Sequence, residues 1–116
     1  MNKIGFGAAL LFAGAMTTAT AHSHLRSSTP AEGSTVAGSP AQVVLGFSEV
    51  SHLAALTVAR GSQAAIKVEP LPQQPAQQLT VPLPRLGAGA WTLGWRVIGE
   101  DGHVTHGTVH FTVTAP

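Results

Sequence analysis

The sequence contains no cysteine and no tyrosine, and only 9% of its 116 residues are charged. Without cysteine there is no disulfide framework, no thiolate metal site and no thiol nucleophile. Six Lys or Arg residues nearly balance five Asp or Glu residues, so the net charge is only +1. No basic patch is left to hold a phosphate backbone, and we expect no nucleic-acid partner. The length allows one small domain.

The first 21 residues have the features of an export signal. Lys3 supplies the positive charge, residues 4–16 form an uncharged apolar run, and residues 19–21 offer the small-x-small pattern for cleavage. The apolar run is shorter than the ~20 residues that span a bilayer, which argues against a membrane anchor. We therefore expect a signal peptide at 1–21 and one domain at 22–116, exported to the periplasm without stable membrane insertion.

Cleavage after Ala21 changes the chemistry of the chain. Both methionines, Met1 and Met16, leave with the signal peptide, so the mature chain contains no sulfur. A new α-amino group appears directly on His22, with a pKa near ~8. The mature chain keeps six histidines and a single aspartate, Asp101, so the histidines are the first residues to examine for function.

The mature sequence predicts strands and no helix. Apolar side chains alternate with polar ones, and clusters of Gly, Pro and Ser separate the alternating runs. The first expected strands lie at Val43–Phe47, Leu56–Val58, Ile66–Val68 and Leu79–Leu83. Pro82 indicates that the last of these is an edge strand. Residues 33–40 are interpreted as turn-rich, and residues 69–78 as a loop rich in Pro and Gln.

The strongest strand signal is a pair of alternating runs at 91–98 and 107–114. The side chains expected in the core are Trp91, Leu93, Trp95, Val97, Val109, Phe111 and Val113. Residues 100–103, between the runs, contain the turn dipeptide Asp-Gly, which predicts a hairpin. Short strands with regular turns over about 95 residues predict an all-β fold, an antiparallel β-sandwich.

Two groups of atoms suggest a metal site. At the new N-terminus, the amine and Nδ1 of His22 can chelate one ion in a small ring. In Asp101-x-His103, a spacing of two in an extended segment places both side chains on one side. Together they supply three nitrogens and one oxygen, a set suited to tetragonal Cu(II), whereas Cu(I) prefers sulfur ligands that the mature chain lacks. A structural role for Asp101, accepting backbone N–H groups in the turn, stays open.

Four motifs follow one another along the mature chain: His22-x-His24-Leu25, Ser27-Ser28-Thr29-Pro30-Ala31-Glu32-Gly33, Phe47-Ser48-Glu49, and Trp95-Arg96-Val97 leading to Asp101-Gly102-His103. In this order they resemble the CopC copper-resistance family of periplasmic copper-binding proteins. The resemblance implies an Ig-like, Greek-key β-sandwich of about seven strands that binds one Cu(II) per chain at one end. The ligands it implies are the amine and imidazole of His22, Asp101 and His103.

The resemblance also implies a role and a partner. The role is that of a carrier or buffer in copper homeostasis and resistance, and the partner is an inner-membrane, CopD-like copper transporter. The sequence departs from part of the family in one respect. Some members carry a methionine-rich Cu(I) site after the Phe-Ser-Glu motif, and here that stretch contains no methionine. We therefore expect a Cu(II)-only protein.

His24 offers an alternative way of binding copper. A free N-terminus with histidine in third place can wrap Cu(II) through the amine, two deprotonated amides and the His24 imidazole. This mode needs a flexible N-terminus and no fold. We favour the mode that uses His22, because pre-organised ligands lose less entropy on binding.

Four further carboxylate or imidazole side chains lie outside this ligand set. Glu49 is open as a weak axial or outer oxygen, or as a solvated carboxylate at a strand end. His106 lies three residues beyond His103 and is open as a neighbour of the metal. His52 is open as a loop residue or as a ligand for another metal, and we favour the loop. His110 is interpreted as an exposed strand residue.

The sequence alone leaves two other functions open. An N-terminal histidine that chelates copper on a β-sandwich is also similar to the arrangement in copper polysaccharide monooxygenases, which are enzymes. We expect no enzyme, because Asp101 would fill an equatorial position and the chain offers little flat aromatic surface for a polysaccharide. The third possibility is an Ig-like module with no metal role.

Overall fold

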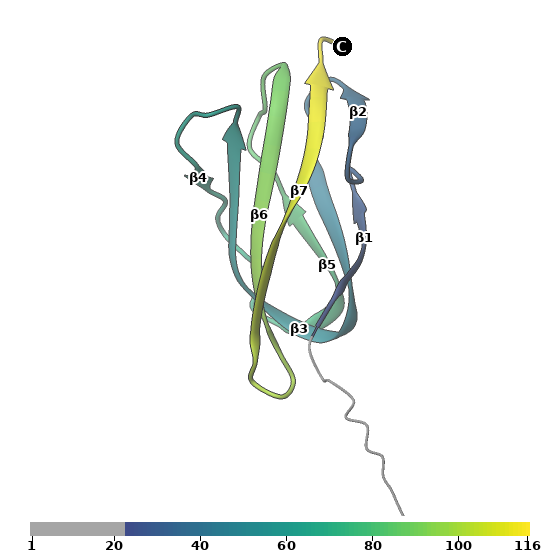
Figure 1. The fold of residues 1–116 in the computed structure, drawn as a ribbon, viewed down its shortest axis with the longest axis vertical. Helices are drawn as coiled ribbons and strands as arrows, with labels where there is room; N and C mark the ends of the chain where they lie inside the picture. Colours follow the sequence, from purple (N-terminus) through teal and green to yellow (C-terminus); the bar gives the residue numbers. More distant parts are fainter. Residues whose placement is uncertain (1–22) are drawn as a thin grey trace, which may run out of the picture.

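The computed structural model describes residues 23–116, which form seven β-strands and no helix (Figure 1). The predicted signal peptide and the proposed ligand His22 lie outside the described residues. In the part that is described, no helix is long and apolar enough to cross a membrane. The strands are β1 (Leu25–Thr29), β2 (Ser34–Ala37), β3 (Gln42–Arg60), β4 (Ile66–Lys67), β5 (Ala76–Pro82), β6 (Gly89–Gly99) and β7 (Val104–Thr114).

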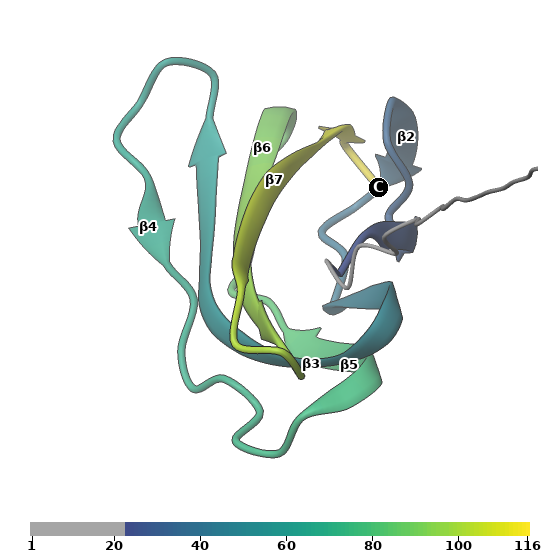
Figure 2. The same cartoon turned by 60° about the horizontal axis from the view of Figure 1, so that its bottom comes forward.

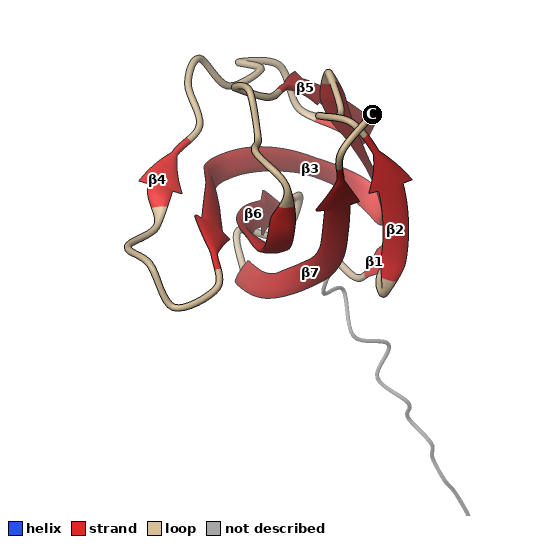
Figure 3. Ribbon diagram, turned by 90° about the horizontal axis from the view of Figure 1, so that it is seen from above, coloured by secondary structure: helices blue, strands red, loops and turns tan. Residues whose placement is uncertain are grey.

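The strands form a curled sheet that closes over a core as a β-sandwich. Their hydrogen-bonding order is β1, β3, β6, β7 and β2, and both β4 and β5 pair with β3. All pairs are antiparallel except β2 with β7, which is parallel. Seen from above, β3 curves around β6 (Figure 3). The predicted all-β fold of about seven strands is confirmed.

β3 is one strand of 19 residues, where the alternation predicts two separate strands. Its first half pairs with β1 and β5, and its second half with β4 and β6. The change comes at Ser51, which pairs with Ala76 of β5 and with Gly99 of β6. The connecting residues stay extended because their backbone groups find partners in both halves of the sandwich. Figure 2 shows this bend of β3 beside the β6–β7 hairpin.

The core contains the side chains that the alternation predicts to face inward. The buried members on β6 and β7 are Trp91, Leu93, Trp95, Val97, Val109, Phe111 and Val113. The rings of Phe47 and Trp95 pack edge to face, with centroids 5.1 Å apart, and so join the first half of β3 to β6. Leu25 of β1 is half-buried against this core. Burial of each large apolar side chain contributes roughly 1.5–3 kcal/mol to folding.

Two predictions of local structure are wrong. Residues 34–37 lie inside the segment interpreted as turn-rich, but they form β2, because their backbone pairs in register with residues 111–114 of β7. Residues 76–78 lie inside the segment interpreted as a loop rich in Pro and Gln, but they form the start of β5, because this strand pairs with β3. In both places the partner strand, and not the local sequence pattern, decides the structure.

The β6–β7 hairpin ends in a three-residue loop, Glu100–Gly102. The N–H of Gly102 donates to the carbonyl of Gly99 at 3.0 Å, and the N–H of Gly99 donates to the carbonyl of His103 at 2.9 Å. Gly102 has φ of +87°, the left-handed conformation that follows a type I turn in such loops. The predicted hairpin is confirmed, and it presents Asp101 and His103 at its tip.

Further along β7, an exposed ion pair ties the hairpin to the turn before β2. The Glu32 carboxylate accepts the backbone N–H of His110 at 2.9 Å, and its other oxygen lies 3.2 Å from the His110 Nδ1. The hydrogen bond from the His110 backbone is the largest cause that holds the pKa of Glu32 below its ordinary value of 4.5. His110 itself is exposed on a strand, as predicted.

This contact predicts a pH-dependent contribution to stability. Because the pKa of Glu32 is lower in the folded chain, its contribution is fully present above pH 4.5 and is lost as the pH falls below that value. Glu32→Gln keeps the side-chain shape but removes the charge. We expect a melting temperature below that of the parent at about pH 6, and a difference that shrinks toward zero at about pH 3. A constant difference would contradict the assignment.

Candidate metal centre

The hairpin loop brings Asp101 and His103 into direct contact. Oδ2 of Asp101 lies 2.7 Å from Nδ1 of His103, and Oδ1 of Asp101 accepts the His103 backbone N–H at 3.0 Å. The same carboxylate thus orders the turn, as the structural interpretation of Asp101 predicted, and also faces the imidazole. The His103 side chain is 63% exposed and that of Asp101 is 27% exposed, so an ion can reach the pair from solvent.

The spacing of this pair suits two neighbouring ligands of one ion. Bonds of about 2.0 Å at a right angle place adjacent ligand atoms about 2.8 Å apart. The Asp101 Oδ2 and His103 Nδ1 atoms already lie 2.7 Å apart, joined by a hydrogen bond. An ion bound by both atoms would take the place of the proton that they share in this hydrogen bond.

The beginning of the described chain lies at this same tip. A Cβ atom on Gly99 would lie 3.3 Å from each of three oxygens, namely Ser23 Oγ, Glu49 Oε1 and Asp101 Oδ1. No two of these oxygens are therefore further apart than twice that distance. Ser23 follows the proposed ligand His22 in the sequence. The start of β1 and the β6–β7 tip are at the same end of the sandwich in Figure 1.

Glu49 supports the tip from β3. Its Oε1 accepts the backbone N–H of Glu100 at 3.3 Å, and the residue is only half-exposed. It is therefore not a solvated carboxylate at a strand end, since it lies inside β3 and contacts the loop that carries Asp101. Its position is that of an outer carboxylate beside the pair.

Ser48 holds the backbone of His24. The His24 N–H donates to Ser48 Oγ at 2.8 Å, and the Ser48 N–H donates to the His24 carbonyl at 2.8 Å. The His24 side chain is exposed. The motifs that contain His24 and Ser48 therefore meet in space, although 24 residues separate them.

Two further histidines lie apart from the Asp101–His103 pair. His52 is in β3 and not in a loop as predicted, because the long strand continues through this segment. It lines a hollow of about 400 Å³ with Val50, Pro75, Ile98, Gly99 and Glu100. His106 is exposed on β7, opposite Arg96 of β6.

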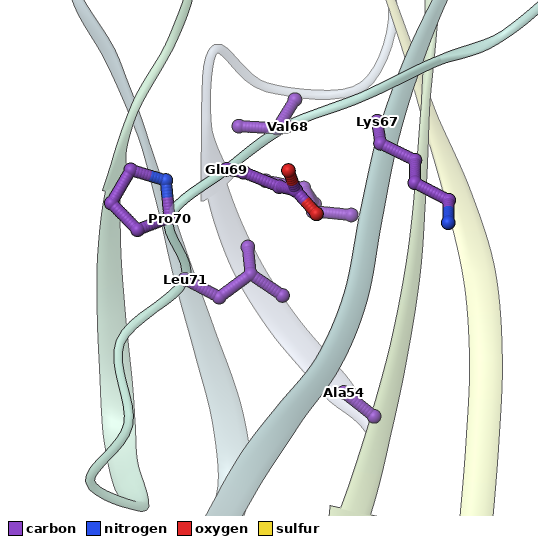
Figure 4. A pocket seen from close by; sticks show the side chains of 7 residues that line it. Ala54, Lys67, Val68, Glu69, Pro70 and Leu71 are labelled. Carbon is purple, nitrogen blue, oxygen red and sulfur yellow. The ribbon is translucent and has the colours of Figure 1, made fainter.

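Other hollows bring no comparable donors together. The hollow beneath β4, about 430 Å³, is lined by Ala54, Leu56, Lys67, Val68, Glu69, Pro70 and Leu71 (Figure 4). The charged groups that line it are the ammonium of Lys67 and the carboxylate of Glu69. Among residues 23–116, no group of three or more His, Asp or Glu side chains is arranged to hold an ion. The Asp101–His103 pair is thus the strongest candidate in the described chain, with two donors.

Residues 25–114 match the family model of the CopC domain. The chain belongs to the CopC family. The CopC family is one of copper resistance proteins, so the chain has a copper-related role. It is 31% identical to copper resistance protein C of Pseudomonas syringae pv. tomato, covering 97% of this chain and 98% of the relative. It is 34% identical to protein YobA of Escherichia coli K12, covering 80% and 79%.

Solved CopC structures share the fold. CopC from Methylosinus trichosporium OB3b superposes with a TM-score of 0.73 at 28% identity, over 81% of this chain and 95% of that one. PcoC of Escherichia coli, described as a methionine-rich copper resistance protein, superposes with a TM-score of 0.60 at 30% identity, over 81% and 100%. The present chain has methionine only at positions 1 and 16.

The sequence did not single out Ser23, Ser51 or Gly99. Ser51 interrupts an apolar alternation and is buried, and Ser23 is buried beside it, which is unusual for serine. Ser51, a polar residue at an inward-facing position, was the signal that the sequence offered. Its hydrogen-bond partner Ser23, 28 residues away, could not be predicted from spacing.

Gly99→Ala is a direct test of the space between the N-terminal segment and the tip. The added Cβ would lie 3.3 Å from three oxygens, closer than usual contacts, and must push Ser23 and Asp101 apart. We expect about a tenfold loss of Cu(II) affinity with little change in the melting temperature of the metal-free chain. Gly87→Ala is the matched control, since its Cβ meets only the flexible end of Arg60. Equal affinities for the two variants would contradict this interpretation.

Proposed function

We propose that the mature chain, residues 22–116, is a periplasmic protein that binds one Cu(II) ion as its cargo. The donors would be the amine and imidazole of His22, the Asp101 carboxylate and the His103 imidazole. The single observation that supports this most is the approach of Ser23, the residue after His22, to Asp101 at Gly99. It supports the proposal because the described start of the chain lies near the hairpin, although the two are far apart along the sequence.

The donor set favours Cu(II) over Cu(I). Three nitrogens and one oxygen suit a tetragonal ion, and the mature chain has no sulfur ligand. We therefore propose a carrier or buffer that works in one oxidation state, and that passes copper to a CopD-like membrane protein. The proposed role is not catalytic, because Asp101 would take an equatorial position that an oxygen-activating copper enzyme leaves open. The His22 amine would become available only when the signal peptide at 1–21 is cleaved after Ala21.

The proposal is tested by titrating the mature protein with Cu(II), after mass spectrometry has verified His22 as its first residue. We expect one ion per chain by calorimetry and a tetragonal spectrum by electron paramagnetic resonance. Because a ligand that binds only the folded state raises stability, the melting temperature should also rise with Cu(II). A mature chain that binds no stoichiometric Cu(II) would exclude the proposed function.

A further inference from the structure

Two buried serines connect the N-terminal segment to the bend of β3. Ser23 and Ser51 are each 1% exposed, and their Oγ atoms are 2.5 Å apart. The Ser51 hydroxyl donates to the carbonyl of Glu49 at 2.9 Å, which uses its one proton. The Ser23 hydroxyl is therefore the donor to Ser51. This chain of two hydrogen bonds fixes Ser23 at the point where β3 passes from one half of the sandwich to the other.

The next residue is tied in a second way. The His24 backbone makes two hydrogen bonds to Ser48, one through its N–H and one through its carbonyl. Wrapping of Cu(II) by the amine, two peptide nitrogens and the His24 imidazole requires the His24 amide to lose its proton and turn toward the ion. In the folded chain that N–H donates to Ser48 Oγ at 2.8 Å. The peptide-nitrogen mode must therefore break contacts that the hairpin mode keeps.

We propose that Ser51 and Ser48 are positioning residues that select between these two ways of binding Cu(II). Ser51 holds Ser23 beside Asp101, and Ser48 keeps the His24 N–H engaged in a hydrogen bond. Together they direct the amino terminus to the Asp101–His103 pair and prevent peptide-nitrogen binding. This inference rests on the proposed function, since it assumes that His22 contributes its amine. It differs from a general stabilising role, because it predicts a change in the identity of the ligands.

The contact geometry around Gly99 supports the same conclusion. Ser51 pairs with Gly99 across β3 and β6, and Ser23 Oγ occupies space that a side chain on Gly99 would fill. A Cβ on Gly99 would therefore press on the Ser23 hydroxyl and shift it by a few tenths of an ångström. Loss of the Ser51 hydroxyl leaves the Ser23 hydroxyl buried without its acceptor, which favours release of the segment to solvent.

The experiment compares the mature protein with Ser51→Ala and with Ser48→Ala. For the parent we expect a spectrum of three nitrogens and one oxygen that depends on His103. For each variant we expect about tenfold weaker binding at that site and the appearance of a four-nitrogen spectrum. Peptide-nitrogen binding also releases additional amide protons, which titration calorimetry in buffers of different ionisation enthalpy will count. Adding His24→Ala to each variant should abolish the four-nitrogen spectrum.

The matched control is Ser39→Ala. Ser39 Oγ accepts the Leu86 backbone N–H at 2.7 Å, so this variant also loses a partly buried hydrogen bond of a serine, but away from the tip. Its melting temperature should fall while its copper spectrum stays that of the parent. If Ser51→Ala does not fold, Ser23→Ala removes the same hydrogen bond from the N-terminal side and should give the same four-nitrogen spectrum.

The two possible failures are distinguishable. If the parent binds through His103 and both serine variants keep its spectrum and proton count, the selection by Ser51 and Ser48 is wrong and the proposed function stands. If the parent itself shows the four-nitrogen spectrum, or no stoichiometric binding, the proposed function and this inference are both wrong.

Discussion

His103→Ala should lower Cu(II) affinity by at least about 100-fold. The variant removes one of the proposed nitrogen ligands and leaves Asp101 without the imidazole that lies 2.7 Å from its Oδ2. Loss of a residue that only hydrogen-bonds to a metal ligand already lowers metal affinity about 10–100-fold. Loss of a direct ligand should therefore lower the affinity more. Calorimetry gives the affinity, and electron paramagnetic resonance should report one nitrogen fewer. The fold should persist, because the His103 side chain is 63% exposed.

His106→Ala is the control for this variant. His106 is an exposed histidine on the same hairpin, three residues further on, and pairs with Arg96 across the strands. We expect it to keep the affinity and spectrum of the parent. If His103→Ala retains both properties instead, the hairpin site is refuted and binding through the His24 imidazole takes its place.

Extending the mature chain by one residue should have a comparable effect. A protein that begins at Ala21 carries an amide where the mature protein carries the His22 amine, so the small chelate ring of amine and imidazole cannot form. We expect a loss of about 100-fold or more in Cu(II) affinity, although every side chain of the mature protein is still present. Calorimetry on the two chains, with both N-termini verified by mass spectrometry, measures the difference.

The extended chain has its own control in metal-free stability. The Ser23–Ser51 hydrogen bond does not involve the amine, so the melting temperatures of the two metal-free chains should agree closely. With excess Cu(II), only the chain that begins at His22 should show a large rise. Equal affinities for the two chains would show that the amine is not a ligand.

Much of the fold was predictable because strand alternation is a local property. Trp91, Leu93, Trp95 and Val97 face the core as their period of two predicts, and Asp-Gly marks the hairpin tip that the structure shows. The errors fall where pairing overrides the local pattern. β2 is extended because it pairs with the edge of β7. β3 continues through His52 because its two halves pair with β5 and with β6.

The candidate site divides in the same way. Asp101 and His103 are two residues apart, and the sequence predicted that they would converge in an extended segment. They do converge, with a 2.7 Å contact, but they do so in a tight turn in which Gly102 has φ of +87°. Ser51 lies in β3, Gly99 lies in β6 and Ser23 precedes β1, and no spacing relates the three residues. Their meeting depends on the bend of β3 and on the register that sets Ser51 opposite Gly99.

By itself, the sequence determined most of the strand pattern, the family and the chemistry of the proposed copper ligands. These features depend on side-chain type and on the alternation of neighbouring residues, which are local properties of the chain. Only the tertiary structure decided that Ser23 lies beside Asp101 and that Ser48 holds the His24 amide. The physical reason is that hydrogen bonds between distant segments depend on how the strands pair and curve, and contacts across 24 or more residues leave no periodic trace in the chain.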